Sequence, residues 1–459
     1  MGGPRVIIVG AGPAGVRAAA TLVAAGITPT LVEEGRRDGG QIYRRQPDGF
    51  VRPYDRLYGS EAAKAAALHR TFEGLVGRIA YRPETLAWNL AEGALHVVSA
   101  GVAEALPFDA LIVCSGATDR LMPVDGWNLP GTYSLGAAQI ALKSQACAIG
   151  RRVVFLGTGP LLYLVATQYH KAGAEVAAVL DTAPAWLRLR ALPHLLARPW
   201  VLARGLMLVT RLRRAGIPVM TGVEPVAIVG TPEAEVGGVT IEDAHGHLRS
   251  FSCDAVALGY HLRPETQLAD LAKVPFAYDD TTRQWLPEAD LDGRTPVPGI
   301  YVAGDGARIL GADAAEIAGQ LAARAALADA GITSDAAKTD SLRQRHAVLK
   351  QFARGLATAF PWPAHLAATS ADSVMVCRCE AITAGDIRDA AGPKDAPELN
   401  RAKALSRIGM GRCQGRFCGP AAAEILAAAR GVPVREVGRL RSAAPVKPLT
   451  MATITEPSA

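Results

Sequence analysis

Four of the seven cysteines are grouped near the end of the chain in a spacing that suits metal binding. Cys377 and Cys379 form one pair, and Cys413 and Cys418 form a second pair that follows after 33 residues. Four thiolates can bind either zinc or a [2Fe–2S] cluster. The Cys-x-Cys pair is tighter than the usual zinc spacing, which favours the cluster and leaves zinc as the alternative.

The surroundings of these cysteines also suit an anionic cluster. Both pairs lead into predicted helices, because Thr383 and Asp386 resemble a helix-capping pair and Pro420 lies near the first position of a helix over 421–430. The positive ends of two helices would stabilise negative charge, and nearby basic side chains would add to this effect. Those side chains are Arg378, Arg412 and Arg416.

The other cysteines, Cys114, Cys147 and Cys253, occur singly. A disulfide-reductase mechanism needs two cysteines that can exchange, and Cys147 has no Cys-x-x-Cys partner. We therefore predict that all three are small buried apolar residues. The nine histidines form no Ser-His-Asp order and no pair with metal-ligand spacing, so no catalytic residue can be named.

A glycine-rich turn near the N-terminus has the spacing of a dinucleotide site. An apolar strand over 6–9 leads into a turn that comprises Gly10, Gly12, Pro13, Ala14 and Gly15. The first glycine permits the turn, the second lets the backbone approach a pyrophosphate, and the third allows close helix–strand packing. Glu33 ends the second strand, where a carboxylate can accept hydrogen bonds from ribose hydroxyls.

Distant segments favour FAD over NAD at this site. A strand over 299–303 ends in Gly304 and Asp305 and precedes an alanine-rich helix over 313–328, which resembles the second flavin motif of flavoproteins with two dinucleotide domains. Asp305 would contact the ribityl or pyrophosphate portion, although an acidic helix cap is the alternative. Gly40 and Gln41 lie in a segment that resembles the loop near the flavin ring, and 114–117 takes the place of the Ala-Thr-Gly crossing.

A second turn of this kind begins at Gly157 and continues through Gly159. Leu162 replaces the third glycine, which would force helix and strand apart or shift the turn. Asp181 follows at the distance of a ribose-binding acid. The pattern predicts a second Rossmann-type unit whose pocket is either degenerate, the favoured interpretation, or a working NAD site.

The elements between the motifs are short. Three strands are expected between residues 79 and 113, over 86–89, 95–98 and 109–113, as a meander that interrupts the first unit. A polar helix is expected from 336 to about 352, followed by a linker around 361–370.

Composition limits the classes of partner. The net charge of +6 fits a solvated basic surface, with an acidic partner or anionic nucleotide as the alternative, and no basic-aromatic stripe indicates nucleic-acid binding. The segment 186–217 is apolar but carries seven arginines and two prolines, so it predicts amphipathic helices and no membrane span. Without a signal-like N-terminus, the chain is expected to be cytoplasmic.

The cysteine motifs give a more specific resemblance. Residues 377–380 and 409–418 resemble the bacterioferritin-associated-ferredoxin-like domain that is fused to certain flavoproteins. Together with 39–44, they resemble the alpha subunits of one enzyme family. That family contains the opine (octopine or nopaline) dehydrogenases, D-hydroxyproline dehydrogenase and hydrogen cyanide synthase. The resemblance covers essentially the whole chain.

This resemblance implies an α/β fold with two Rossmann-type dinucleotide-binding domains, one inserted in the other, and a small helical C-terminal iron–sulfur domain. The expected boundaries are 1–118 with 288–332 for the FAD-binding domain, 119–287 for the second, NAD-like domain, 333–370 for the linker, 371–440 for the [2Fe–2S] domain and 441–459 for the tail.

The family also implies a function. A separate amino-acid-oxidase-like beta subunit, in some members with a small third subunit, oxidises an amine or amino acid. The alpha subunit passes electrons through FAD and the cluster to an acceptor, and some relatives place FMN at a subunit interface. The alternative is an NAD(P)H-dependent flavin and iron–sulfur reductase, against which Leu162 argues.

Overall fold

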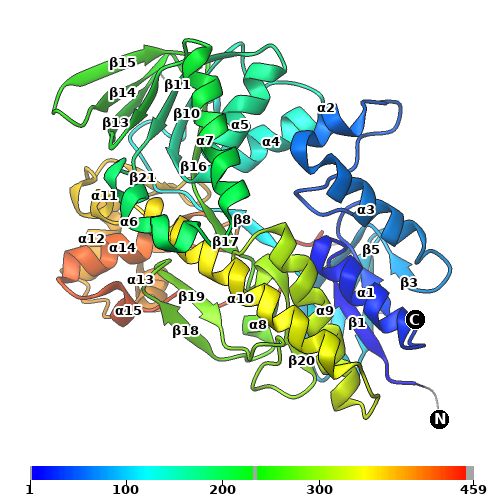
Figure 1. The fold of residues 1–459 in the computed structure, drawn as a ribbon. Helices are drawn as coiled ribbons and strands as arrows, with labels where there is room; N and C mark the ends of the chain where they lie inside the picture. The colour runs from blue at the N-terminus through cyan, green and yellow to red at the C-terminus, as the bar shows by residue number, and fades with distance from the viewer. Residues whose placement is uncertain (1–2, 231–234, 451–459) are drawn as a thin grey trace.

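The computed structural model describes residues 3–230 and 235–450. Its core consists of two parallel five-stranded sheets (Figure 1). The strand order in the first sheet is β20-β7-β1-β2-β3. The bounds of these strands are β1 Val6–Val9, β2 Thr30–Val32, β3 Ala80–Arg82, β7 Ala110–Val113 and β20 Ile300–Val302.

The first sheet is covered on both faces because its strands are apolar on both. In β1, Ile8 packs against the helices on one face, and Ile7 packs against a small antiparallel sheet on the other. Helices α1 and α9 cross so closely that a Cβ at Gly319 would lie 2.0 Å from the Ala14 carbonyl oxygen. The helices of this part are α1 Pro13–Ala24, α2 Tyr54–Tyr58, η1 Gly59–Glu61, α3 Ala62–Glu73, α8 Gln267–Leu271, η2 Gly304–Gly306 and α9 Ala312–Asp329.

The expected meander is corrected in its third strand. The structure contains an antiparallel sheet of β4 Thr85–Ala91, β5 Ala94–Ser99 and β6 Val102–Pro107, whereas β7 belongs to the parallel sheet. Strand β6 was missed because it lies at an edge, with much of its surface exposed, and lacks clear apolar alternation.

The second parallel sheet has the order β12-β11-β10-β16-β9. Helices α4, α5 and α7 pack on one face, and a three-stranded sheet, β13-β14-β15, contributes to the core on the other. The strands are β9 Thr132–Ser134, β10 Arg152–Thr158, β11 Glu175–Asp181, β12 Val219–Thr221, β13 Glu224–Val229, β14 Gly238–Glu242, β15 Leu248–Ser252 and β16 Ala255–Tyr260. The helices are α4 Leu135–Ser144, α5 Pro160–Lys171, α6 Trp186–Leu195 and α7 Pro199–Arg214.

Of the three short antiparallel ladders among the described residues, two lie before the C-terminal part. One joins β8 Ala117–Asp119 to β17 Leu262–Pro264, where the chain leaves the first sheet and where it returns. The other is the hairpin of β18 Phe276–Asp279 and β19 Gln284–Pro287. The observed fold therefore confirms the predicted α/β class with two Rossmann-type sheets.

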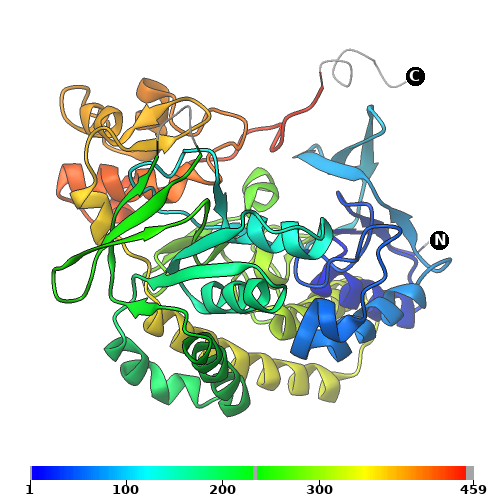
Figure 2. The same ribbon diagram turned by 90° about the horizontal axis from the view of Figure 1, so that it is seen from above.

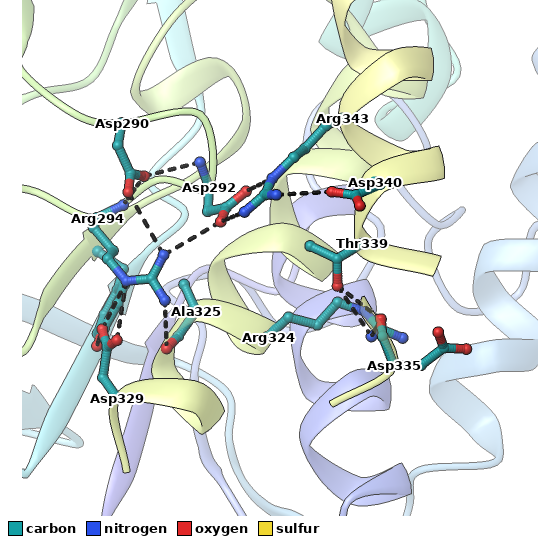
Figure 3. Close-up of polar contacts among 11 residues, drawn as sticks. Asp290, Asp292, Arg294, Arg324, Ala325, Asp329, Asp335, Thr339, Asp340 and Arg343 are labelled. Carbon is teal, nitrogen blue, oxygen red and sulfur yellow. Dashed lines mark hydrogen bonds and ion pairs between the residues drawn. The ribbon is translucent and has the colours of Figure 1, made fainter. Parts of the chain in front are cut away.

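Helix α10 (Ala336–Ala359) connects the two halves of the molecule (Figure 1). It is longer than expected, packs on α9 near its start, and packs on α6 near its end. Arg343 forms ion pairs with Asp292 and with Asp340, and Asp292 also pairs with Arg294 (Figure 3). This network holds the start of α10 against the first unit.

The C-terminal part is a small helical domain. Its elements are α11 His365–Thr369, β21 Met375–Cys377, β22 Ile382–Thr383, α12 Ala384–Ala391, α13 Leu399–Ser406, α14 Cys418–Arg430 and α15 Val434–Val437. Helix α11 lies inside the expected linker, and α14 begins three residues before the predicted helix. The predicted capping box of Thr383 and Asp386 is confirmed.

The last described segment leaves the C-terminal domain and returns to the antiparallel sheet β4-β5-β6, where the Val446 N–H donates to the Trp88 carbonyl (Figure 2). Residues 451–459 of the expected tail lie outside the described residues. Within 3–230 and 235–450, no helix combines the length and the apolarity that a membrane crossing requires.

Candidate cofactor sites

The first glycine turn has the tight geometry that its sequence predicts. Gly10 has a φ of +100°, and a Cβ there would lie 2.4 Å from the Cys114 carbonyl oxygen. A Cβ at Gly15 would lie 1.8 Å from the Gly10 carbonyl oxygen. Gly12 is the N-cap residue of α1 and has no side chain that could cap the helix, and Pro13 is the first residue of α1. The N-terminus of α1 is thus formed by small residues that leave its backbone accessible to an anion.

The loop over 39–41 lies directly on this turn. Gly40 has a φ of +60°, and a Cβ at this position would lie 2.9 Å from the Gly12 Cα. Gln41 is exposed, and its side-chain oxygen accepts a hydrogen bond from Arg44 at 2.7 Å. The structure therefore brings this loop and the dinucleotide turn together.

Glu33 stands at the carboxyl end of β2 and binds the backbone of the same turn. Its Oε2 accepts from the Ala11 N–H at 2.6 Å, and its Oε1 accepts from the Gly35 N–H at 2.7 Å. Burial raises the pKa of Glu33, and these two N–H groups oppose the rise. Each carboxylate oxygen has a second lone pair, so the side chain can shape the turn and still accept from a ribose hydroxyl.

Asp305 begins the second flavin-like segment. Its Oδ1 accepts hydrogen bonds from the N–H groups of Leu310 and Gly311, at 2.9 and 3.0 Å, just before α9. Burial raises the pKa of Asp305, and the two N–H groups lower it. Gly304, with a φ of +68°, packs on α1, since a Cβ there would lie 2.8 Å from the Ala14 Cβ. The helix-capping role and the predicted contact with a ligand are compatible, because Oδ2 accepts neither of these bonds.

These groups line one large cleft of about 1930 Å³. This exceeds the range of roughly 300–1,000 Å³ that is usual for small-molecule sites. The predicted residues that line it are Gly10, Gly12, Pro13, Ala14, Glu33, Gly40, Gln41 and Asp305. Gly15 and Gly304 are not among the lining residues and instead pack α1 against its neighbours. The cleft also reaches Arg416 and Phe417, which lie between two of the predicted cluster cysteines.

The structure brings the four C-terminal cysteines together. Cys377 ends β21, and Cys418 is the first residue of α14. Cys379 is exposed, and Cys413 is half-buried. The backbone is packed closely around them: a Cβ at Gly411 would lie 2.3 Å from the Cys379 Cβ.

The four side chains interact in a chain, Cys377 with Cys418, Cys418 with Cys413, and Cys413 with Cys379. A hydrogen bond from Cys418 lowers the pKa of Cys377 to about 6, and Cys418 has the same effect on Cys413, whose pKa falls to about 5. The pKa of Cys418 itself is raised, mainly by Cys377 and then by Cys413. Backbone N–H groups also stabilise the two acidic thiols; they belong to Cys379, Glu380 and Gly409 for Cys377, and to Gly415 and Phe417 for Cys413.

This donor set fits an iron–sulfur cluster. Thiolates with backbone N–H groups directed at the sulfurs are the ligands and surroundings of such clusters.

The arginines beside the cysteines differ in their environment. Arg412 and Arg378 are exposed, and the Arg378 guanidinium lies 5.6 Å from the centre of the Trp127 ring. Arg416 is buried and pairs with Glu265, at 2.6 Å between Nε and Oε2. Sequence reasoning missed Glu265, because 151 residues separate it from its partner and no local motif marks it.

The second dinucleotide unit is closed by its own side chains. Asp181 is fully buried, and its carboxylate accepts four hydrogen bonds, from Thr158, Tyr163, Arg188 and the Ala183 N–H. The predicted ribose-binding acid is therefore directed into the protein. Burial raises its pKa, and the four donors, led by Tyr163, lower it.

A histidine covers the turn of this unit. A Cβ at Gly159, the N-cap of α5, would lie 3.2 Å from the His261 ring. His261 Nε2 is hydrogen-bonded to the carbonyl of Phe360, the residue after α10, and the two rings are in contact. Leu162 is fully buried, so it fills the core and does not reach a ligand. These contacts support the degenerate interpretation of the pocket.

The single cysteines confirm two predictions of three. Cys114 and Cys253 are buried, and burial raises the pKa of Cys114 to about 12 and that of Cys253 to about 11. Cys147 is exposed, which corrects the expectation, because it lies in the loop after α4 and not in a core element.

Two family models match the chain. Residues 4–326 match the pyridine nucleotide-disulphide oxidoreductase family, and residues 375–428 match the BFD-like [2Fe-2S] binding domain. The cofactors are accordingly FAD and a [2Fe–2S] cluster.

Similar proteins cover almost the whole chain. An opine oxidase subunit from Agrobacterium tumefaciens (strain Ach5) is 39% identical over 98% of this chain and 91% of its own length. Hydrogen cyanide synthase subunit HcnB of Pseudomonas aeruginosa is 31% identical over 97% of each chain. Among solved structures, L-proline dehydrogenase from P. horikoshii superposes with a TM-score of 0.70 at 18% identity, over 99% of this chain and 79% of that one. This last similarity concerns the fold alone.

Proposed function

This chain belongs to the same family as the opine oxidase subunit, within the pyridine nucleotide-disulphide oxidoreductases, and from that membership we propose that it is the electron-transfer subunit of a multi-subunit amine or amino-acid dehydrogenase. The substrate would be of the opine or D-hydroxyproline type, oxidised at a CH–NH bond. Substrate oxidation takes place on a separate amino-acid-oxidase-like beta subunit, to which a small third subunit can be added.

One observation carries this proposal. The cleft that contains the dinucleotide turn also reaches Arg416 and Phe417, inside the loop that bears Cys413 and Cys418. A two-electron carrier and a one-electron carrier would therefore lie on one continuous surface. FAD accepts two electrons and releases them singly, which matches it to a cluster that carries one.

We assign the binding residues from the geometry. The turn of Gly10, Gly12 and Gly15 with Pro13 and Ala14 would receive the pyrophosphate at the start of α1. Glu33 would accept from the ribose, and Asp305, behind Gly304, would accept from the ribityl portion. Gly40 and Gln41 would border the flavin ring. The cluster ligands would be Cys377, Cys379, Cys413 and Cys418.

The same proposal divides the chain into domains. Residues 1–118 and 288–332 would bind FAD, 119–287 would form the second Rossmann-type domain, 333–370 the connection, 371–440 the cluster domain and 441–459 the tail. An FMN at the interface with the beta subunit and a further electron acceptor complete the proposed complex.

The closed second unit argues against the alternative, an NAD(P)H-dependent reductase. An enzyme that uses NADH needs an acid for the adenosine ribose, and one that uses either nucleotide needs a free helix N-terminus for the pyrophosphate. Here Asp181 is saturated with internal hydrogen bonds, and His261 lies over Gly159.

The test is reconstitution. The chain is purified with and without a candidate amino-acid-oxidase-like chain, and amine oxidation is followed with an artificial acceptor. We expect turnover, and substrate-dependent appearance of the reduced-cluster EPR signal, with the complex only. Amine oxidation by the isolated chain at the rate of the complex would contradict the proposal.

A further inference from the structure

We infer that Glu265 is a positioning residue that joins the flavin cleft to the cluster loop and sets the electric charge beside the cluster. Neither its neighbours in sequence nor a motif marks it, and its role follows from contacts on both sides. The inference rests on the proposed assignment of the cluster to the four C-terminal cysteines.

On the flavin side, Glu265 is held through its backbone. Its carbonyl accepts a hydrogen bond from the Ser115 hydroxyl at 2.5 Å, and its N–H donates to the Gly116 carbonyl at 2.9 Å. This crossing loop is tightly packed, since a Cβ at Gly306 would lie 2.7 Å from the Ser115 hydroxyl oxygen. The position of Glu265 is therefore fixed by the wall of the cleft that carries the flavin motif.

On the cluster side, Glu265 is held through its side chain. Its carboxylate pairs with Arg416, and the side chains are only 12% and 7% exposed. Arg416 Nη1 donates to the carbonyls of Cys413 and Val446, at 3.3 and 2.7 Å. The guanidinium thus connects Glu265 to the backbone of a predicted cluster ligand.

Two further contacts fix the same loop to the same segment. Arg263 Nη1 donates to the Arg416 carbonyl at 2.8 Å, and Gln267 Nε2 donates to the Gln414 carbonyl at 3.0 Å. The segment 263–267 therefore binds the loop between Cys413 and Cys418 at three points. Such support fixes the separation of the two redox sites.

Glu265 also contributes a negative charge beside the cluster loop. Arg263 and Arg416 place two positive charges beside the cluster loop, and Glu265 is the anion that lies between them. Burial lets these charges act at a higher effective strength than in water. Loss of the carboxylate would leave additional positive charge at the loop, which stabilises the more negative, reduced form of the cluster.

The decisive variant is Glu265→Gln, which keeps the shape and removes the charge. In the full chain with its cofactors, we expect the equilibrium for reduction of the cluster to shift at least tenfold toward the reduced form. For a one-electron couple this equals about 59 mV in midpoint potential. The measurement is a redox titration followed by the EPR signal of the reduced cluster.

A matched control is available in the same domain. Glu424 lies on α14, pairs with Arg283 at 2.6 Å, is similarly buried, and also joins the C-terminal domain to the rest of the chain, but its side chain contacts Arg283 and Trp362 and not the cluster loop. Glu424→Gln should lower stability without moving the potential. An unchanged potential in Glu265→Gln, or an equal shift in both variants, would overturn the inference.

A second variant tests the inference if the Glu265→Gln protein loses its cluster. Arg416→Lys keeps the positive charge but loses the planar fork of the guanidinium. The equilibrium constant for reduction of the cluster should therefore stay within tenfold of wild type, while electron transfer from flavin to cluster slows. A larger shift of the potential in Arg416→Lys would contradict the charge argument.

The redox titration uses neither the amine nor the partner subunit. A failed reconstitution would therefore count against the proposed function and leave the result for Glu265 intact. An active complex with an unmoved potential in Glu265→Gln would do the reverse.

Discussion

The imidazole of His261 lies over Gly159, at the place where a working dinucleotide site would receive a pyrophosphate. His261 has a φ of +66°, a backbone conformation that non-glycine residues rarely adopt, and burial lowers its pKa to about 4. The ring is therefore neutral at physiological pH and offers no charge to a phosphate.

The first prediction concerns this closure. NADH and NADPH should not bind the protein at concentrations up to about 1 mM. A dissociation constant above this concentration corresponds to a free energy of binding weaker than about −4 kcal/mol. Calorimetric titration of the full chain, together with stopped-flow measurement of flavin absorbance, checks this. Saturable binding with rapid bleaching of the flavin would show that the second unit opens.

The second prediction concerns the cluster ligands. Replacing Cys413 by serine should reduce bound iron at least tenfold and abolish the cluster EPR signal, because a serine hydroxyl is a poor ligand for these irons. FAD content should stay the same, because Cys413 does not line the cleft. Cys147→Ser is the control, since Cys147 is exposed and lies outside the C-terminal domain. Full iron retention in Cys413→Ser would exclude Cys413 as a ligand.

The third prediction uses two glycines with opposite surroundings. Gly15→Ala places a Cβ 1.8 Å from the Gly10 carbonyl oxygen, so it should lower the free energy of unfolding by about 1–3 kcal/mol and weaken FAD binding. Gly205→Ala meets no atom within 4 Å and lies in exposed α7, so it should raise stability by about 0.5–1 kcal/mol. Urea unfolding and FAD content provide the measurements. Equal effects of the two substitutions would contradict the packing at the turn.

The fourth prediction concerns pH. Burial alone would raise the pKa of Asp270, but hydrogen bonds from Arg439 and from the Ser442 N–H, with the arginine charges, lower it to about 2. Since the folded-state pKa lies below the unfolded-state value of about 3.9, the stabilisation is present at neutral pH and is lost as the pH falls from about 5 toward 2. The difference between the two values corresponds to about 2–3 kcal/mol.

Asp270→Asn therefore should destabilise the protein at pH 7, and the gap to wild type should narrow as the pH falls. Urea unfolding at pH 7, 5 and 3 measures both quantities. A gap that is as wide at pH 3 as at pH 7 would mean that the charge of Asp270 does not contribute.

The sequence predicts the parts of the sites that depend on local geometry. The turn at Gly10 and Gly15 and the capping box of Thr383 and Asp386 follow from spacing alone, and the structure contains them. In each case the interacting groups lie within a few residues of one another. The chemistry of the cysteines is similarly readable, because two close pairs leave few alternatives.

The long-range contacts could not be predicted in this way. Asp181 stands at the spacing of a ribose-binding acid, and only the fold shows that Arg188 and Tyr163 occupy its carboxylate. His261 meets a carbonyl 99 residues away, and Glu265 meets a guanidinium 151 residues away. No local period or propensity encodes such pairs, because they arise from the path of the chain between elements.

The position of α10 has a consequence for the rate of electron transfer within the chain. The helix is fixed to the first unit by Arg343 and Asp292, packs on α6, and is followed by Phe360, which contacts His261. A hinge rotation of one sheet relative to the other would have to break the contacts at both ends of this helix. Electron transfer within the chain is therefore expected to proceed from one rigid arrangement, and its rate should not change when the viscosity of the solvent is raised.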